Sequence, residues 1–250
     1  MTPSRWRLIA LDMDGTTLSH DLAISDENKK WIRKARESGI EVTFATGRHI
    51  SGIVRKSIRD LELNAPAVTM NGSEVWTPQE QLLSRRSLTV DDIQWLLGVA
   101  RQAGTKYWGD TVEGHFEELE FPNTLDDYTW LKFGFYSTDS TRIQQVWQTL
   151  EREERFELSN SHPLNVEVNP LGVTKATGLQ TVCDYLNIDP SKVVVMGDSL
   201  NDVPMIKWAG LGVAMGNAQD TVKRVADFVT GRNDENGVAQ AIERILNNDI

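Results

Sequence analysis

The chain has 250 residues, of which 40% are hydrophobic and 25% charged, the composition of an ordinary globular protein with one or two domains. Its formal net charge of -10 disfavours broad electrostatic binding to nucleic acid or to an anionic membrane surface. The single cysteine, Cys183, excludes a disulfide within the chain. The apolar run before Asp12 is too short for a signal peptide, and no stretch approaches the roughly 18 apolar residues of a membrane span. We therefore expect a soluble, cytoplasmic protein.

Residues 1–80 alternate between predicted strands and helices. Short apolar runs predict strands at 7–12, 42–46 and 65–70. A helix is expected after the first strand, capped by Ser25 and ended by Gly39, and another follows near 50–61. This alternation is typical of a parallel sheet with helices on both faces.

The pattern changes in residues 81–171. Thr89 and Asp92 are typical of the start of a helix near 90–103, and a second helix is predicted near 140–152. Strands are predicted at 105–108, 130–137, 156–159 and 164–168. This part is also more acidic, since residues 81–170 hold 15 acidic and 8 basic side chains. Strands flanking two helices indicate a small α+β module inserted in the chain.

The first pattern returns after the insertion. Strands are predicted at 193–196 and 211–214, and helices at 175–187, at 201–208 and from about 235. We therefore predict an α/β protein with a Rossmann-like parallel sheet core, formed by residues 1–80 and 172–250. A smaller α+β domain is inserted over 81–171.

Two carboxylates follow the first strand. Asp12 and Asp14 are two positions apart, so the alternation of side chains along a strand predicts that both point the same way. They stand at the carboxyl end of a parallel strand, where ligands bind in open sheets. Two carboxylates this close are unfavourable unless a cation or a shared proton relieves their repulsion. The alternative is a polar turn that merely closes the strand, with Gly15 permitting the bend.

A second acidic group follows the strand predicted at 193–196. Asp198 stands at its carboxyl end, and Asn201 and Asp202 begin the next helix. Taken alone, these residues could simply cap that helix. Together with Asp12 and Asp14 on a neighbouring strand, however, they create the oxygen-rich environment that Mg²⁺ prefers.

An acidic cluster that binds an anionic substrate needs cationic and hydroxyl partners. Thr46, Gly47 and Arg48 supply a hydroxyl, a turn and a guanidinium at the end of the second predicted strand. Lys175 begins a helix, where exposed N–H groups also favour an anion. A lone lysine is usually a solvated surface charge, but its predicted place at the start of the resumed sheet favours a role in the site.

Taken in order, these segments resemble the four motifs of the haloacid dehalogenase superfamily: Asp12–Thr16, Thr46, Lys175 and Gly197–Asp202. The insert between the second and third motifs is similar to the cap domain of its Cof-type sugar-phosphatase branch. Further local matches are Ala45–Arg48, Asn71–Gly72 and Glu235–Val238. The resemblance covers essentially the whole chain. It implies a catalytic core with an inserted cap domain.

The resemblance also implies a reaction. It is the Mg²⁺-dependent hydrolysis of phosphomonoesters of small metabolites, with sugar phosphates as the expected class. Asp12 would be the nucleophile that becomes an aspartyl phosphate, and Asp14 the general acid and base. Mg²⁺ would be held by Asp12, the backbone carbonyl of Asp14, and Asp198. The phosphoryl oxygens would be bound by Thr46, Arg48, Lys175, Asn201 and the backbone N–H groups near Met13 and Gly47. Asp202 would orient Lys175 or a metal-bound water.

Two other functions share part of this pattern. A phosphomutase of the phosphomannomutase kind has the same motif set, chain length and cap position. A non-catalytic phosphosugar-binding protein is the third alternative, although a sensor does not need both Asp12 and Asp14. In each case the expected partner is a small phosphorylated metabolite, not nucleic acid or a membrane. Polar and aromatic side chains of the insert that could contact this substrate are Trp108, Asp110, Glu113, His115 and Glu117.

Overall fold

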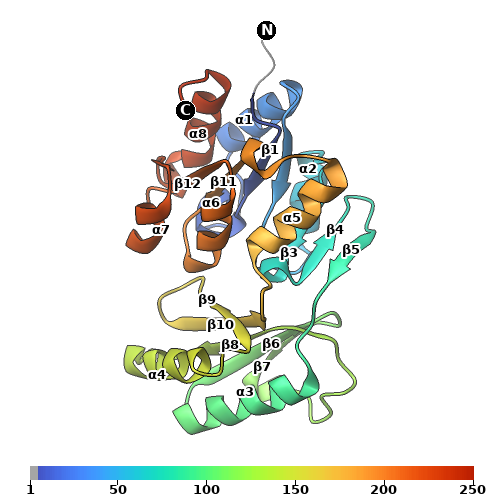
Figure 1. Ribbon diagram of the computed structural model, residues 1–250, viewed down its shortest axis with the longest axis vertical. Coiled ribbons are helices and arrows are strands. Elements are labelled where there is room, and N and C mark those ends of the chain that lie inside the picture. The colour runs from blue at the N-terminus through green and yellow to red at the C-terminus, as the bar shows by residue number, and fades with distance from the viewer. Residues whose placement is uncertain (1–4) are drawn as a thin grey trace. The chain divides into compact units, whose positions relative to one another are not determined.

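The computed structural model describes residues 5–250, and these residues form two compact units. The first unit combines the chain up to Ser84 with Lys175–Ile250, and the second is Arg85–Thr174. Figure 1 shows the second unit, coloured green to yellow, as one continuous stretch of chain inserted in the first. No helix in residues 5–250 combines the length and the apolar character needed to cross a membrane.

A five-stranded parallel sheet forms the centre of the first unit. Its spatial order is β13-β12-β11-β1-β2, and every neighbouring pair is parallel. The strands are β1 (Leu8–Leu11), β2 (Glu41–Phe44), β11 (Val193–Gly197), β12 (Leu211–Ala214) and β13 (Phe228–Val229). Every residue of β1, β11 and β12 is buried, as expected for parallel strands covered on both faces.

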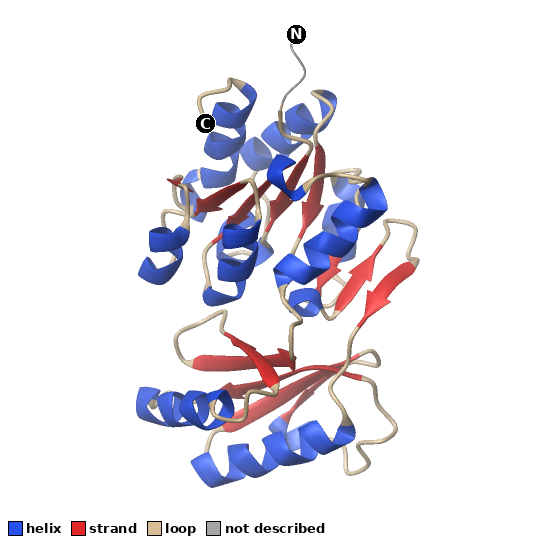
Figure 2. Cartoon of the chain, in the orientation of Figure 1, coloured by secondary structure: helices blue, strands red, loops and turns tan. Residues whose placement is uncertain are grey.

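Helices lie on both faces of this sheet (Figure 2). They are α1 (Asp26–Glu37), α2 (Ile53–Asp60), α5 (Lys175–Leu186), α6 (Val203–Trp208), α7 (Asp220–Val225) and α8 (Gly237–Leu246). Helix α1 packs against α8, and α5 packs against α6. The predicted cap of α1 is confirmed, because Ser25 Oγ accepts a hydrogen bond from the backbone N–H of Asn28 at 3.1 Å. The α/β prediction is therefore correct.

The third predicted strand pairs differently from the expectation. It forms β3 (Ala67–Thr69), which joins β4 (Glu74–Trp76) and β5 (Leu82–Arg85) in a separate sheet. β3 and β4 are antiparallel, and a parallel bridge between Ala45 and Val68 links β3 to the end of β2. The reason lies directly after β3. Met70 and Asn71 have φ values of +50° and +57°, so the chain reverses there.

The second unit is the predicted α+β module. It carries α3 (Val90–Ala103), α4 (Ser140–Glu151), β6 (Lys106–Thr111), β7 (His115–Glu117), β8 (Trp130–Tyr136), β9 (Phe156–Ser159) and β10 (Asn165–Pro170). The strands form one sheet in the order β7-β6-β8-β10-β9. Both helices lie on one face of this sheet (Figure 1), where they pack on buried side chains such as Phe133 and Phe135. The predicted start of α3 is confirmed by a capping box between Thr89 and Asp92.

Candidate active site

Asp12 lies at the carboxyl end of β1, between β11 and β2 in the parallel sheet, and only 5% of it is exposed. Its Oδ1 accepts a hydrogen bond from Lys175 Nζ at 2.5 Å. Lys175 is the first residue of α5 and is completely buried. Its Nζ also donates to Asp202 Oδ1 at 2.7 Å. One buried ammonium therefore lies between two buried carboxylates.

The loop after β11 fixes Asp202. Its Oδ2 accepts hydrogen bonds from the backbone N–H groups of Asp198 at 2.8 Å and Ser199 at 3.0 Å. The close approach of this side chain requires a glycine at position 197, because a Cβ there would lie 2.3 Å from Asp202 Cγ. Asp202 is thus held on three sides, by two backbone donors and by Lys175.

Asp198 faces the turn that follows β1. Its Oδ1 accepts a hydrogen bond from Thr16 Oγ1 at 3.0 Å, across 182 positions of sequence. Gly15 packs directly against the same carboxylate, since a Cβ at Gly15 would lie 2.5 Å from Asp198 Oδ2. Gly15 also has a φ of +70°, which a side chain disfavours. The loops after β1 and β11 therefore contact each other, and segments that lie far apart in the sequence contribute to the site.

Carboxylate oxygens of Asp12, Asp198 and Asp202 all lie within 4.8 Å of one another. Burial raises the pKa of Asp12 well above its usual value, and burial together with Asp202 raises the pKa of Asp198 to about 7. Burial opposes the charge of Lys175, but Asp12 and Asp202 outweigh it and raise the pKa of that amine. Three carboxylates around one ammonium leave excess negative charge. Such a set of oxygen donors fits a hard divalent cation.

The carboxylate of Asp14 lies outside this group, although the sequence pattern places it beside that of Asp12. It binds Arg48, whose Nε and Nη2 lie 2.7 Å and 2.6 Å from its two oxygens. Strand alternation does not reach Asp14 because β1 ends at Leu11 and the chain coils through Met13–Thr17. Arg48, expected to bind phosphate, therefore has a carboxylate as its partner. The hydrogen bonds that Arg48 donates to Asp14 raise the pKa of the guanidinium further, so it stays charged.

The remaining predicted phosphate ligands come together after β2 and β11. Thr46 is buried, and its Oγ1 accepts a hydrogen bond from the backbone N–H of Arg48 at 3.1 Å. Asn201 Nδ2 donates to Asn71 Oδ1 at 3.2 Å. Within residues 5–250, Asn201 Oδ1 is buried without a hydrogen-bond partner. Gly47 packs against the side-chain amide of Asn71, since a Cβ at position 47 would lie 2.9 Å from Asn71 Oδ1.

Three asparagines that the sequence analysis did not assign to the site support these loops. Asn71 joins the loops after β2 and β11, and its place in the Asn71–Gly72 match is the signal that could have identified it. Asn217 Nδ2 donates to the carbonyl of Gly15 at 2.7 Å, and Asn217 Oδ1 accepts from the backbone N–H of Asn233 at 2.9 Å. Asn233 Nδ2 in turn donates to the carbonyl of Leu18 at 2.9 Å. Asn217 and Asn233 therefore hold the backbone of the turn after β1 by hydrogen bonds to its carbonyl groups.

In the second unit, the polar residues considered for substrate contact bind one another. His115 Nδ1 lies 2.8 Å from Asp110 Oδ1, and its Nε2 lies 3.1 Å from Glu117 Oε1. Lys132 Nζ lies 3.4 Å from Asp110 Oδ2 and 3.5 Å from Glu167 Oε2. Glu113 accepts a hydrogen bond from the backbone N–H of Thr129, and Trp108 packs over Gly134. A contact between these side chains and substrate remains a prediction.

Comparison with known proteins decides the family. The sequence profile of the haloacid dehalogenase-like hydrolases matches residues 9–242. The chain belongs to this family. A 5-amino-6-(5-phospho-D-ribitylamino)uracil phosphatase of Bacillus subtilis is 44% identical over 236 residues, which cover 94% of each chain. A second Bacillus subtilis phosphatase of that name is 29% identical over 260 residues, covering 94% of this chain and 96% of the relative.

The fold agrees with this assignment. The structure of a haloacid dehalogenase-like hydrolase from B. subtilis superposes with a TM-score of 0.86 at 25% identity, covering 95% of this chain and 99% of that one. The predicted superfamily is therefore confirmed. This haloacid dehalogenase-like hydrolase is a phosphatase, which cleaves phosphoric monoesters of small metabolites.

Proposed function

We propose that this hydrolase uses Mg²⁺ and an aspartyl phosphate on Asp12 to hydrolyse the phosphomonoester of a sugar or sugar alcohol. The observation that carries the proposal is the position of Asp12. Its carboxylate lies at the end of β1, hydrogen-bonded to a buried lysine and beside two further carboxylates. A carboxylate attacks a phosphate dianion efficiently only where cations offset the charge of both.

The donor set supports a magnesium site. The side chains of Asp12 and Asp198 and the backbone carbonyl of Asp14 would hold the ion, and all three are oxygen donors. Asp202 lies in the same group of carboxylates, but its oxygens already accept hydrogen bonds from Lys175 and two backbone N–H groups. When bound, Mg²⁺ neutralises charge on the transferring phosphoryl group.

The protein's own groups would then carry out two displacements. In the first, an oxygen of Asp12 bonds to phosphorus, the bond from phosphorus to the ester oxygen breaks, and Asp14 gives that oxygen its proton. In the second, water attacks phosphorus, Asp14 takes a proton from that water, and the bond between phosphorus and the Asp12 oxygen breaks. Inorganic phosphate then leaves and Asp12 is restored. Lys175, Thr46, Asn201 and the N–H groups near Met13 and Gly47 would bind the phosphoryl oxygens throughout.

We assign substrate selection to residues 81–171, which form the cap domain in the family resemblance. For the substrate we propose 5-amino-6-(5-phospho-D-ribitylamino)uracil. The support is the relative that is 44% identical along 94% of the chain and carries that substrate in its name. This molecule is a phosphomonoester of a small metabolite, as expected from the sequence, but its phosphate is carried by a sugar alcohol and not by a sugar.

The test measures phosphate release from 5-amino-6-(5-phospho-D-ribitylamino)uracil, ribose 5-phosphate and glucose 6-phosphate. We expect kcat/KM for the ribitylaminouracil phosphate to exceed the other two at least about tenfold, a difference of roughly 1.4 kcal/mol in transition-state binding. A preference for one of the other sugars would overturn the substrate assignment alone. A parallel reaction includes a sugar 1,6-bisphosphate, and interconversion of glucose phosphates there would instead support a phosphomutase.

A further inference from the structure

The ion pair between Arg48 and Asp14 is a specific contact of the site that has no role in the proposed reaction. Two parallel hydrogen bonds join the guanidinium to the carboxylate, at 2.7 Å and 2.6 Å. Such bidentate pairs fix the planes of both groups and are stronger than single hydrogen bonds. The pair therefore selects one orientation of the Asp14 side chain.

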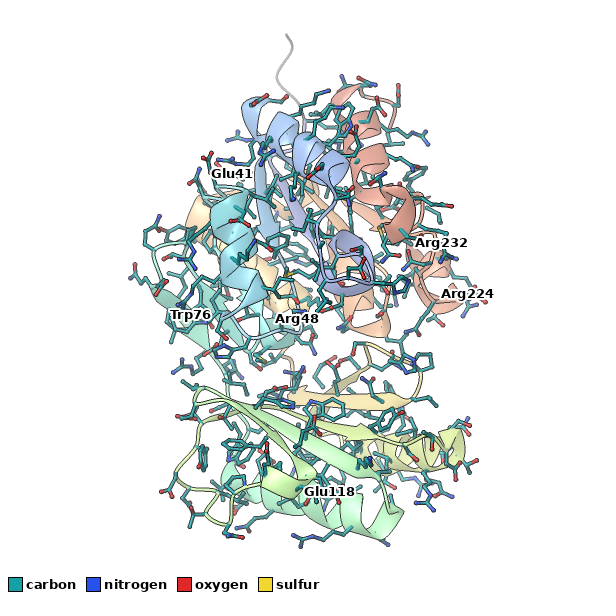
Figure 3. All side chains as sticks on the ribbon, turned by 180° about the vertical axis from the view of Figure 1, so that it is seen from behind. Glu41, Arg48, Trp76, Glu118, Arg224 and Arg232 are labelled. Atoms are coloured by element: carbon teal, nitrogen blue, oxygen red, sulfur yellow. The ribbon has the colours of Figure 1, made fainter. Side chains whose placement is uncertain are left out.

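The backbone on each side of this pair is already fixed. The N–H of Arg48 donates to Thr46 Oγ1 at 3.1 Å, and its carbonyl accepts from the N–H of Met70 at 3.1 Å. On the other side, the carbonyl of Gly15 is held by Asn217. Figure 3 labels Glu41, where β2 begins, and Arg48, which lies beyond the opposite end of that strand. With both backbones held, the orientation of the Asp14 carboxylate depends on its side-chain torsions and on Arg48.

Asp12 and Asp14, at the turn after β1, thus each pair with a different cationic side chain. Lys175 binds Asp12, and Arg48 binds Asp14. The Asp14 pair is partly open to solvent, with side-chain exposures of 31% for Arg48 and 47% for Asp14, whereas Lys175 is fully buried. The Asp14 carboxylate is therefore accessible from solvent while Arg48 holds its orientation.

We propose that Arg48 is a positioning residue, which orients the Asp14 carboxylate for both proton transfers and does not serve mainly as a ligand of the phosphoryl group. This inference rests on the acid and base role of Asp14 in the proposed function. It gives the guanidinium a role distinct from that of Lys175 and the phosphate-binding backbone N–H groups. Arg48 acts on the reaction through Asp14.

The two possible roles of Arg48 predict different responses to the leaving group. A nitrophenolate ion leaves without help from an acid, whereas an alkoxide needs a proton. A residue that acts through the general acid therefore slows the first displacement mainly for alkyl phosphates, whereas the second displacement is the same for both substrates. A residue that binds the phosphoryl group matters equally for both, because that group is the same in the two substrates.

The experiment compares Arg48→Gln with wild type on p-nitrophenyl phosphate and on one alkyl phosphate. The alkyl phosphate is the one that wild type hydrolyses fastest among ribitol 5-phosphate, ribose 5-phosphate and glucose 6-phosphate. In single-turnover experiments, which report the first displacement alone, we expect the rate of leaving-group release to fall about 10- to 100-fold for the alkyl phosphate, within the usual worth of general acid–base catalysis, and less than about threefold for p-nitrophenyl phosphate. We expect the substrate concentration at half of the maximal single-turnover rate to change less than about threefold on both. Arg48→Lys, which keeps the charge but loses the second hydrogen bond, should show the same selectivity in weaker form.

A double-mutant cycle then identifies the partner. The double variant of Arg48→Gln and Asp14→Asn should be no slower on the alkyl phosphate than Asp14→Asn alone, since Arg48 has nothing left to orient. Arg55→Gln is the matched control, because Arg55 also pairs with a carboxylate, Glu80 at 3.3 Å, but lies outside the site. It should change neither rate.

Other results separate the two levels of the argument. Equal losses of the single-turnover rate on both substrates, weaker substrate binding or additive effects in the cycle would show that Arg48 binds the phosphoryl group, which overturns the inference alone. If Asp14→Asn itself slows leaving-group release from both substrates equally, the acid role of Asp14 fails, and the inference fails with it. Circular dichroism and thermal unfolding of every variant establish that the rates come from folded protein.

Discussion

Lys175 Nζ and Asp12 Oδ1 lie 2.5 Å apart although 163 positions of sequence separate them. The contact joins the first residue of α5 to the residue that follows β1, and neither side chain has appreciable access to solvent. A buried ammonium is tolerated only where carboxylates surround it, and here Asp202 supplies the second one at 2.7 Å. The same contact therefore serves the fold and the chemistry.

Replacing Lys175 tests how much this side chain contributes to the stability of the folded protein. Lys175→Met leaves the buried carboxylates of Asp12 and Asp202 without their cation, so we expect the free energy of unfolding to fall by about 3–5 kcal/mol. Urea denaturation followed by circular dichroism measures it. Lys192→Met, which removes an exposed lysine of the same unit, is the control and should cost less than about 0.5 kcal/mol. Equal stability of the two variants would show that Lys175 contributes little to folding.

Metal removal tests the proposed magnesium site. EDTA should abolish hydrolysis of p-nitrophenyl phosphate, and added Mg²⁺ should restore it. Mg²⁺ should also raise the melting temperature of wild type, because an ion that binds only the folded state stabilises it. Asp198→Asn should lose most of that shift. Ca²⁺ should inhibit, since its larger and looser coordination admits an extra carboxylate oxygen and disturbs the line of attack. Full activity in metal-free buffer would contradict the assignment.

Substitution of Asp12 and substitution of Asp14 should impair the reaction at different steps. Asp12→Asn removes the nucleophile, so both turnover and phosphoenzyme should disappear. Asp14→Asn keeps the nucleophile but lacks the base for the second step, which is typically worth 10²–10⁴-fold. An activated ester such as p-nitrophenyl phosphate should therefore phosphorylate this variant, and the phosphate should accumulate. Intact mass spectrometry after an acid quench detects it. A phosphate found on the Asp12→Asn protein would reverse the assigned roles.

Asn71 separates a backbone effect from a side-chain effect. Its φ of +57° costs most residues about 1–2 kcal/mol, whereas glycine adopts this conformation readily. Asn71→Ala should therefore be less stable than Asn71→Gly by about 1 kcal/mol or more, as measured by urea denaturation. Both variants lose the amide that accepts from Asn201, so both should lose activity to a similar extent. Full activity in Asn71→Gly would show that only the backbone conformation matters.

The insert should carry a pH-dependent contribution to stability. The hydrogen bond to Asp110, with further help from Glu117, raises the pKa of His115 from 6.5 to about 9. A raised pKa stabilises the folded state fully below pH 6.5, and the contribution is lost as the pH rises through about 9. His115→Gln should thus destabilise the protein more at pH 6 than at pH 10, by a modest amount because the imidazole is 50% exposed. Unfolding at both values measures it, with the exposed His20→Gln as control. An equal effect at both pH values would exclude a charged His115.

The sequence predicts the long and strongly patterned elements well. The predicted helix at 90–103 and the predicted strand at 211–214 match α3 and β12, because capping residues and unbroken apolar runs are local signals. The strands β4, β5, β7 and β13 have two to four residues each, too few for a pattern to show. The partner of β3 depends on backbone reversal at Met70 and Asn71, which a composition pattern does not encode.

The same limit applies to the site. Residue type and strand ends were sufficient to select Asp12, Asp198, Lys175 and Asp202, which the fold brings together. The pairing of Asp14 with Arg48 could not be predicted, because it follows from the coil after β1 and not from strand geometry. The support from Asn217 also lies outside local patterns, since 202 positions separate it from Gly15.

The place of β1 between β2 and β11 has a consequence for synthesis of the protein. A nascent chain exposes β1 and β2 early, but β11 leaves the ribosome only after the whole of Arg85–Thr174. At bacterial and eukaryotic translation rates of about 5–20 residues per second, one edge of the apolar strand Leu8–Leu11 waits unpaired for roughly 10–40 s. Within residues 5–250, the strands of the insert form their own sheet, so that part can fold before β11 is available to the core. We expect chaperone dependence and aggregation to be greatest in chains truncated just before Val193.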